Sequence, residues 1–226
     1  NGVYTLKAEE TYSYVAVKTG YVTKKDTISV TEDTEKTITM EKAPESTRKD
    51  VSAAWKNFRN SDDNMGITSA KTPTSEATTY EKWFKKLGSG WGAAPSVQII
   101  VDNSLIVMSA NHIYKLDLNT GDILQTGDMV AATNFGYTPP TYADGMIFAP
   151  LADGRVQAFN AETLESLWVY QDTLKGQSLS PITYSDGYIY TGFWNAETKD
   201  ANYVCIPVTD EDPTNAQEAK EAAWQY

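Results

Sequence analysis

The side chains that most often carry catalysis are scarce in this chain. Among its 226 residues there is one histidine, His112, and one cysteine, Cys205. Hydrolytic triads and histidine-rich zinc sites need more ligands than these, and a single cysteine allows neither an internal disulfide nor a thiolate-rich metal site. His112 precedes an Ile-Tyr-Lys-Leu run, and Cys205 lies within Tyr-Val-Cys-Ile-Pro. Both patterns are typical of strands, so we expect both side chains to be structural.

Two acidic segments carry oxygen atoms of the kind that bind Ca²⁺. They are Asp210–Glu218 and Asp62-Asp63-Asn64. The first lacks the turn glycine and the ligand spacing of an EF-hand loop, and the same caution applies to the second. We therefore predict a solvated acidic loop that leads into a helix-prone segment at 218–222, and no metal site. Whether a cation binds the 210–218 loop stays open at this point.

The charge of the chain excludes several classes of partner. A net charge of −11 at pH 7 repels phosphate backbones and anionic membrane surfaces, so nucleic acid is not expected. There is no run of about 18 apolar residues, so no membrane span is expected. No signal peptide is visible, although Asn1 falls in what reads as the middle of a strand, which leaves room for a signal upstream.

Residues 1–43 alternate between apolar and polar side chains over short runs, a pattern typical of strands. About four strands are expected, as in the C-terminal part of a small β-sandwich. Tyr4-Thr-Leu6, Tyr12-Ser-Tyr14 and Gly20-Tyr21 resemble the end of the immunoglobulin-like or PEGA-type modules of bacterial surface proteins. A polar linker is predicted at 44–54, and Trp55 and Phe58 are expected to anchor the polar stretch that follows.

An internal repeat organises residues 55–226. Asp102-Asn103, Asp144-Gly145 and Asp186-Gly187 recur at intervals of 42 residues, and an apolar run follows each of them. These dipeptides favour tight hairpin turns that need positive φ. Each repeat then continues with a third strand and a fourth strand. Four antiparallel strands with this period predict the blades of a β-propeller, of which about three can be placed.

Tryptophans support this register. Trp83, Trp168 and Trp224 are each expected on a fourth strand, where an indole can fill the space between neighbouring blades. The run Ala158-x-Asn160-x-x-Thr163-Leu164-x-x-x-Trp168 resembles the tryptophan-docking motif of quinoprotein (PQQ-like) β-propellers, with leucine in place of glycine at position 164. The preceding copy runs from Lys115 to Gln125; it keeps the aspartate, threonine and glycine but not the alanine and tryptophan.

This resemblance implies two classes of function. Quinoprotein dehydrogenases hold pyrroloquinoline quinone and Ca²⁺ at the propeller centre, with a catalytic aspartate, and many carry a disulfide between adjacent cysteines. This chain has no such cysteine pair, and no carboxylate can be matched to the metal ligands or to the catalytic aspartate. We therefore expect no cofactor and a non-catalytic binding or scaffold module, with a fragment of a quinoprotein dehydrogenase as an alternative.

A further alternative is the capture of a carbohydrate or a peptide by aromatic loops. In a propeller, the loops after the second and fourth strands share one face. Flat aromatic faces beside amide side chains suit sugar stacking and hydrogen bonding, and the competing interpretation is that these aromatics pack between blades. The candidate ligand-binding residues are Trp91, Phe135, Tyr137, Gln177, Trp194 and Asn195.

The sequence thus predicts an all-β chain: a partial β-propeller of four-stranded antiparallel blades at 55–226, with a small N-terminal β-sandwich fragment at 1–43. Propellers close with about four to eight blades, so missing sequence or other chains are expected to complete the ring. The expected location is extracellular or at the bacterial cell surface, and the expected partner is a glycan or another surface protein.

Overall fold

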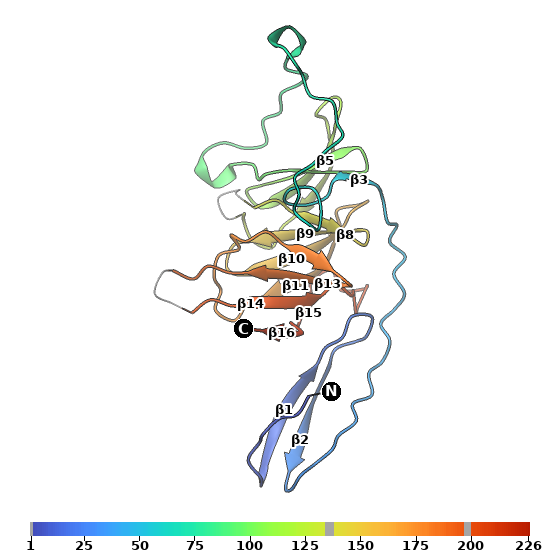
Figure 1. Cartoon of the computed structure of the whole chain (residues 1–226), viewed down its shortest axis with the longest axis vertical. Helices are drawn as coiled ribbons and strands as arrows, with labels where there is room; N and C mark the ends of the chain where they lie inside the picture. Colours follow the sequence, from blue (N-terminus) through green and yellow to red (C-terminus); the bar gives the residue numbers. More distant parts are fainter. Residues whose placement is uncertain (1, 134–137, 197–199) are drawn as a thin grey trace.

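The structure is a computed structural model that describes residues 2–133, 138–196 and 200–226. Three sheets follow one another along the chain and lie side by side in space (Figure 1). The first contains β3 (Ala53–Trp55), β4 (Ile99–Val101), β5 (Ser104–Ser109), β6 (His112–Asp117) and β7 (Ile123–Asp128). The second contains β8 (Thr141–Ala143), β9 (Met146–Leu151), β10 (Arg155–Asn160), β11 (Ser166–Gln171) and β15 (Glu218–Lys220). The third contains β12 (Thr183–Ser185), β13 (Tyr188–Gly192), β14 (Tyr203–Pro207) and β16 (Trp224–Gln225).

Each sheet contains the four antiparallel strands expected of a blade, so the prediction of an all-β, partial propeller is confirmed. The repeated turns explain the period. Asp102 and Asn103 have φ of 50° and 53°, and Asp144-Gly145 and Asp186-Gly187 also have positive φ at both positions. Tight hairpin turns of this kind need positive φ twice, which aspartate, asparagine and glycine tolerate best.

The hydrophobic core lies between the blades. One cluster joins the first and second sheets, and another joins the second and third. β9 shows how the alternation of a strand builds both clusters: Ile147, Ala149 and Leu151 face the first sheet, whereas Met146 and Phe148 face the third. Because the second sheet is covered on both faces, all six residues of β9 are buried and its sequence is continuously apolar.

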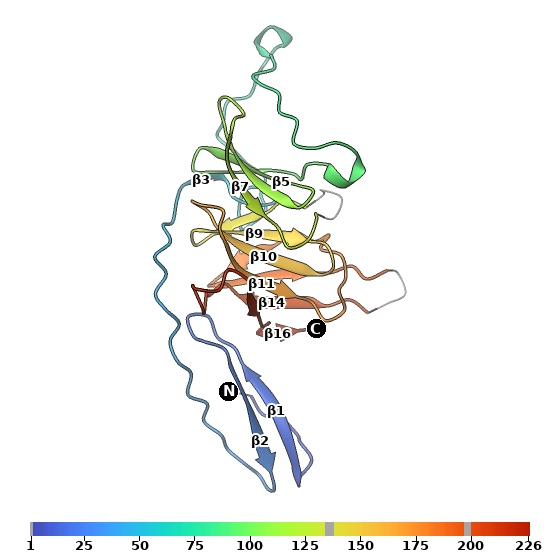
Figure 2. The same ribbon diagram turned by 180° about the vertical axis from the view of Figure 1, so that it is seen from behind.

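The N-terminal residues form a hairpin rather than the expected four strands. Among the described residues of 1–43, the strands are β1 (Glu10–Ala16) and β2 (Lys24–Val30), with one isolated bridge between Tyr21 and Lys42. The hairpin extends away from the blades (Figures 1 and 2). The segment with Ile38 and Met40 alternates but joins no strand. Alternation defines the faces of a strand and cannot supply an edge to pair with, so the sandwich and its immunoglobulin-like resemblance are not shown.

The segment expected as a linker is anchored to the propeller. The carbonyl of Ser52 accepts the amide hydrogen of Asp102 (2.8 Å), and a Cβ added to Gly145 would lie 2.6 Å from the carbonyl oxygen of Lys49. Residues 48–53 thus form a strap that runs past the first two of the repeated turns. Tyr142 Oη donates to Asp50 (2.5 Å), and burial together with this carboxylate raises the pKa of Tyr142 to about 12. The strap is therefore part of the folded domain.

Two further expectations differ from the structure. Trp83 lies in an irregular segment and not on a fourth strand. The helix-prone residues at 218–222 instead start with β15, which pairs in parallel with β11. Helix propensity is a weak preference, and pairing with an available strand edge overrides it here. In the described ranges the only helices are the short η1 (Glu76–Thr78) and η2 (Trp91–Ala93), and none is long and apolar enough to cross a membrane.

Candidate functional site

Trp168 docks the second blade onto the third. Its side chain is fully buried, its Nε1 donates to the carbonyl of Val208 (3.2 Å), and its ring centroid lies 5.7 Å from that of Phe148. Val208 directly follows β14, the third strand of the next blade. The indole therefore links the outer strand of one blade to the strand end of its neighbour, as the motif predicts.

Trp83 makes the equivalent contact without a strand to hold it. Its Nε1 donates to the carbonyl of Leu118 (3.1 Å), the residue that follows β6. A Cβ added to Gly121 would lie 2.5 Å from Cε3 of this indole, so only glycine fits beneath the ring. The aspartate of the same motif, Asp117, accepts the amide hydrogens of Asn119 (2.7 Å) and Thr120 (2.9 Å), which lower its pKa.

The junction between the first and second blades is built differently. Here Gln125 stands where Trp168 stands in the next blade, and Leu164 stands where Gly121 stands in the first. Leu164 is buried between the two sheets and keeps a positive φ of 57°. Because no indole lies on this turn, a leucine side chain can occupy the space. The two departures from the motif are therefore a matched pair across the junction.

Lys115 is the third member of this change. It pairs in register with Gln125, as Ala158 pairs with Trp168. Its Nζ lies 3.4 Å from the carbonyl oxygen of Ala161, 3.5 Å from that of Glu162 and 3.6 Å from a carboxylate oxygen of Asp102. Ala161 follows β10 as Val208 follows β14, so the ammonium replaces the indole N–H as the donor to this carbonyl.

A pocket of about 440 Å³ lies beside this junction. It combines carboxylates, a buried ammonium and a primary amide. Oε1 of Gln125 is buried and has no hydrogen-bond partner within the described part of the chain. We call this space the junction pocket. Its lining residues are Asp102, Asn103, Ser104, Lys115, Asp117, Leu124, Gln125 and Glu162.

Two of the predicted ligand-binding loops meet. The amide hydrogen of Gln177 is donated to the carbonyl of Trp194 (2.6 Å) and that of Trp194 to the carbonyl of Gln177 (2.9 Å). This pairing fixes the backbone of Trp194, and the residue is 47% exposed. Asn195 Nδ2 donates to the carbonyl of Asp200 (3.0 Å). We call the Gln177–Trp194 pair and its flanking residues the loop platform.

The other predicted residues are Trp91, Phe135 and Tyr137. Trp91 lies in η2 and is 75% exposed. Figures 1 and 2 place η2, drawn in green, on the same side of the blades as the loop that follows β13. Phe135 and Tyr137 lie outside the described residues.

Sequence reasoning missed the residue that organises the platform, Asp172. This carboxylate is fully buried; it accepts hydrogen bonds from the Asn202 amide (2.8 Å) and from the backbone N–H of Leu174 (3.0 Å). It thereby ties the loop after β11 to the loop after β13. Beneath them, Phe193 is buried and stacks on Tyr170, with ring centroids 6.2 Å apart. An aspartate directly after a strand and before Thr173 is a turn signal that could have been noticed.

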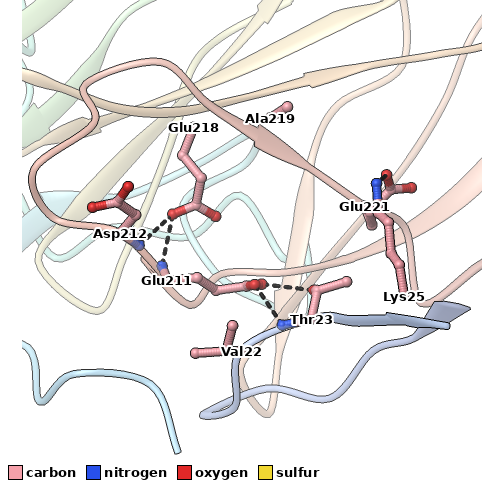
Figure 3. Close-up of a pocket in the computed structure, with 8 residues that line it drawn as sticks. All are labelled: Val22, Thr23, Lys25, Glu211, Asp212, Glu218, Ala219 and Glu221. Atoms are coloured by element: carbon pink, nitrogen blue, oxygen red, sulfur yellow. Dashed lines mark hydrogen bonds and ion pairs between the residues drawn. The ribbon is translucent and has the colours of Figure 1, made fainter. Parts of the chain in front are cut away.

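The acidic loop at 210–218 receives the N-terminal hairpin (Figure 3). Glu211 accepts hydrogen bonds from the backbone N–H (2.6 Å) and the hydroxyl (2.9 Å) of Thr23, and Lys25 pairs with Glu221. Glu218 points back at the loop and accepts the amide hydrogens of Glu211 (2.8 Å) and Asp212 (2.6 Å). An open pocket of about 410 Å³ lies between hairpin and loop.

These carboxylates are engaged by the cations of the chain itself. Asp210 pairs with Arg48 (2.8 Å), and Lys220 lies 2.7 Å from Glu211 and 3.1 Å from Glu218. Within the described ranges no three His, Cys, Asp or Glu side chains come together in a way that could hold a metal ion. The described residues therefore do not offer the cluster of carboxylates that the Ca²⁺ ion of a quinoprotein centre would need.

The lone histidine and cysteine have local roles. His112 begins β6, as expected, and its Nδ1 lies 2.9 Å from a carboxylate oxygen of Asp128 on the neighbouring strand. Cys205 is buried in β14 opposite Trp224, and burial raises the pKa of its thiol. A thiol with a raised pKa is a poor nucleophile at neutral pH.

Comparisons with known proteins agree with the geometry. The family model described as outer membrane protein assembly factor BamB matches residues 74–195. A search of the curated proteins finds no match.

Among solved structures, quinohemoprotein alcohol dehydrogenase ADHIIG from Pseudomonas putida HK5 is similar to this chain with a TM-score of 0.58 and 17% identity. The match covers 76% of this chain and 26% of that one, so the chain spans about a quarter of the dehydrogenase. BamB from Moraxella catarrhalis matches with a TM-score of 0.38 and 17% identity, over 54% of this chain and 34% of that one.

Proposed function

The chain belongs to the family described as outer membrane protein assembly factor BamB, and on this premise we propose that it is a non-catalytic binding or scaffold module of a bacterial surface protein. The family description concerns assembly at the outer membrane, which supports an extracellular or cell-surface location. The partner that we favour is another protein. The dehydrogenase likeness contributes the propeller fold alone, because a fold does not carry an activity with it.

The loop platform is the observation that carries this proposal. Reciprocal backbone hydrogen bonds between Gln177 and Trp194 make two loops into one rigid surface, and Asp172 holds both loops from below. An exposed indole on a rigid support loses little side-chain entropy on binding, and tryptophan is enriched among the residues that dominate protein interfaces.

Site-specific photo-crosslinking tests this role. A photoreactive phenylalanine analogue at position 194, introduced in the bacterium that makes the protein, should give one discrete protein adduct after irradiation. The same analogue at Phe84, which is 76% exposed and lies away from the platform in sequence, is the matched control and should give none. Equal adducts at both positions, or no adduct at 194, would contradict the proposal.

A glycan is the second candidate partner, because Trp194 is followed by Asn195 and paired with Gln177. An indole face with neighbouring amides can stack on a sugar ring and hydrogen-bond its hydroxyls. A glycan array with the wild type and with Trp194→Ala separates the two candidates. Binding that disappears in the variant supports the glycan; an array without signal supports the protein partner.

The alternative of a dehydrogenase fragment has a direct assay. The chain is incubated with pyrroloquinoline quinone and Ca²⁺, and dye-linked oxidation of primary alcohols is followed. We expect no turnover above that of the quinone alone. Turnover that requires the protein would replace the binding proposal.

A further inference from the structure

The outer edges of the first two blades differ in one respect. Among the described residues, β7 is the last strand of its sheet, whereas the corresponding strand of the second blade, β11, carries β15 as a parallel neighbour. β15 pairs residue by residue with Trp168, Val169 and Tyr170. In the first blade these positions are Gln125, Thr126 and Gly127, since the two strand pairs have the same register and the same irregularity. The outer edge of β7 therefore corresponds to the edge of β11 that pairs with β15.

The side chains of β15 enter the junction between the second and third blades. Lys220 is buried; its Nζ donates to the carbonyl of Thr209, contacts Glu211 and Glu218, and lies 5.9 Å from the centre of the Trp168 ring. Between the two charged residues, the small Ala219 points to the exposed side. An acidic–small–basic strand therefore closes the rim of this junction.

The corresponding rim between the first and second blades is the junction pocket. Three carboxylates line it, those of Asp102, Asp117 and Glu162, with one ammonium in the lining, that of Lys115; Glu162 also lies 3.7 Å from Lys49 Nζ at the exposed side. The contacts of that ammonium with oxygen atoms, at 3.4 to 3.6 Å, are long for hydrogen bonds of a buried lysine. The buried Oε1 of Gln125 has no donor among the described residues, and the ammonium of Lys115 has no acceptor at short distance. A segment bound in the pocket can therefore supply one donor and one acceptor.

We propose that the outer edge of β7 and the junction pocket bind an extended segment of a partner protein, added parallel to β7, with the acidic–small–basic pattern that β15 has in the next blade. The basic side chain then lies among Asp102, Asp117 and Glu162, and the acidic one completes the contacts of Lys115. Main-chain hydrogen bonds supply affinity and the two charges supply selectivity. This surface is separate from the loop platform, so the inference goes beyond the proposed function.

The probe is a fluorescein-labelled peptide with the sequence of residues 214–223, which contains the β15 pattern. We expect saturable binding to the full chain by fluorescence anisotropy. Hydrogen exchange of the complex should slow at residues 123–128. The same peptide with Lys220→Glu should bind about tenfold more weakly, the size of effect expected from losing one favourable charge contact.

Two variants of the full chain locate the binding. Lys115→Ala removes the ammonium that faces the acidic side chain of the peptide and should weaken binding about tenfold. Glu162→Lys reverses an exposed carboxylate of the lining; it should weaken the original peptide about tenfold and strengthen the Lys220→Glu peptide. Glu76→Lys in η1 makes the same charge change on an exposed residue outside the pocket and should leave both affinities unchanged.

The inference is overturned if the peptide does not saturate at millimolar concentration or if both variants bind it as the wild type does. Slowed exchange at 168–171 instead of 123–128 would mean that the peptide displaces β15, and it would equally overturn the assignment. If sedimentation shows that two copies of the chain associate through β15, the segment on the β7 edge belongs to a second copy and not to a partner protein, and this part of the inference is overturned. Trp194→Ala should not alter peptide binding, because the loop platform is a separate surface. A failure of the function proposed for the loop platform can therefore be distinguished from a failure of this inference.

Discussion

Lys115 and Gln125 face each other across β6 and β7 at the register position that Ala158 and Trp168 occupy in the next blade. The lysine takes over a carbonyl contact that an indole N–H makes elsewhere, and Leu164 fills the turn on which an indole would lie. Lys115, Gln125 and Leu164 thus differ from the tryptophan-docking motif together, and their side chains pack in the same junction. It keeps the blades together while it opens a polar pocket at their rim.

This linkage can be measured. Leu164→Gly should cost about 2 kcal/mol or more in the free energy of unfolding, because it removes a buried side chain, although it also relieves the positive φ. The triple variant Lys115→Ala/Gln125→Trp/Leu164→Gly restores the motif and should regain at least half of that loss. Urea unfolding provides the values. A triple variant whose stability is the sum of three independent losses would show that the positions are not coupled.

Trp168 should be the most sensitive of the docking positions. Its fully buried indole contacts both sheets of the second junction, so Trp168→Ala should cost about 3–5 kcal/mol and increase hydrogen exchange in the third sheet. Phe84→Ala removes an exposed aromatic ring and should change stability by less than about 0.5 kcal/mol. Comparable losses for the two variants would argue against docking through the indole.

Asp117 should make stability depend on acid. Hydrogen bonds from the backbone N–H groups of Thr120 and Asn119 lower its pKa below the usual 3.8. A carboxyl with a lowered folded-state pKa stabilises the fold above its unfolded pKa, and this stability is lost as pH falls through the folded value. Asp117→Asn should therefore be less stable than wild type at pH 7. The difference between their free energies of unfolding, which we call the gap, should narrow below about pH 4. A gap that stays constant with pH would contradict the assignment.

The buried pair of Arg48 and Asp210 should hold the strap to the third blade. Both side chains are nearly inaccessible, and removing one partner of such a pair leaves an uncompensated charge that costs about 3 kcal/mol or more. We expect Arg48→Met to destabilise by that amount and to expose residues 44–50 to proteolysis. Adding Asp210→Asn should recover much of the loss. If the double variant is as unstable as the sum of the single ones, the pair is not coupled.

Asp172 should control the loop platform without being part of it. Asp172→Ala removes the acceptor for the Asn202 amide and for the Leu174 backbone N–H, at a cost of about 1 kcal/mol because both donors are only partly buried. We expect photo-crosslinking from position 194 to fall several-fold while circular dichroism at 25 °C stays unchanged. Asp172→Asn retains one acceptor and should give an intermediate result. Unchanged crosslinking in Asp172→Ala would show that the platform does not depend on this carboxylate.

The platform shows how far the sequence could go. Gln177, Trp194 and Asn195 were predicted as ligand-binding residues from the local composition of their loops, and they stay predictions, although the structure pairs the first two through their backbones. Asp172 and Asn202 were missed because their value lies in a contact between two loops that only the folded chain brings side by side. Phe135 and Tyr137 stay predictions.

Local sequence patterns were enough to predict the blades: where the repeated strands run, which faces they bury, and where the chain turns every 42 residues, as at Asp144 and Asp186. These features follow from backbone dihedrals and from the period of two along a strand, which are local. Three features became visible only in the folded chain: β15 pairs with β11 of the neighbouring blade, the strap lies against the first two repeated turns, and Lys115 replaces an indole. Each of these depends on an edge or a space that distant residues create, and no local pattern records it.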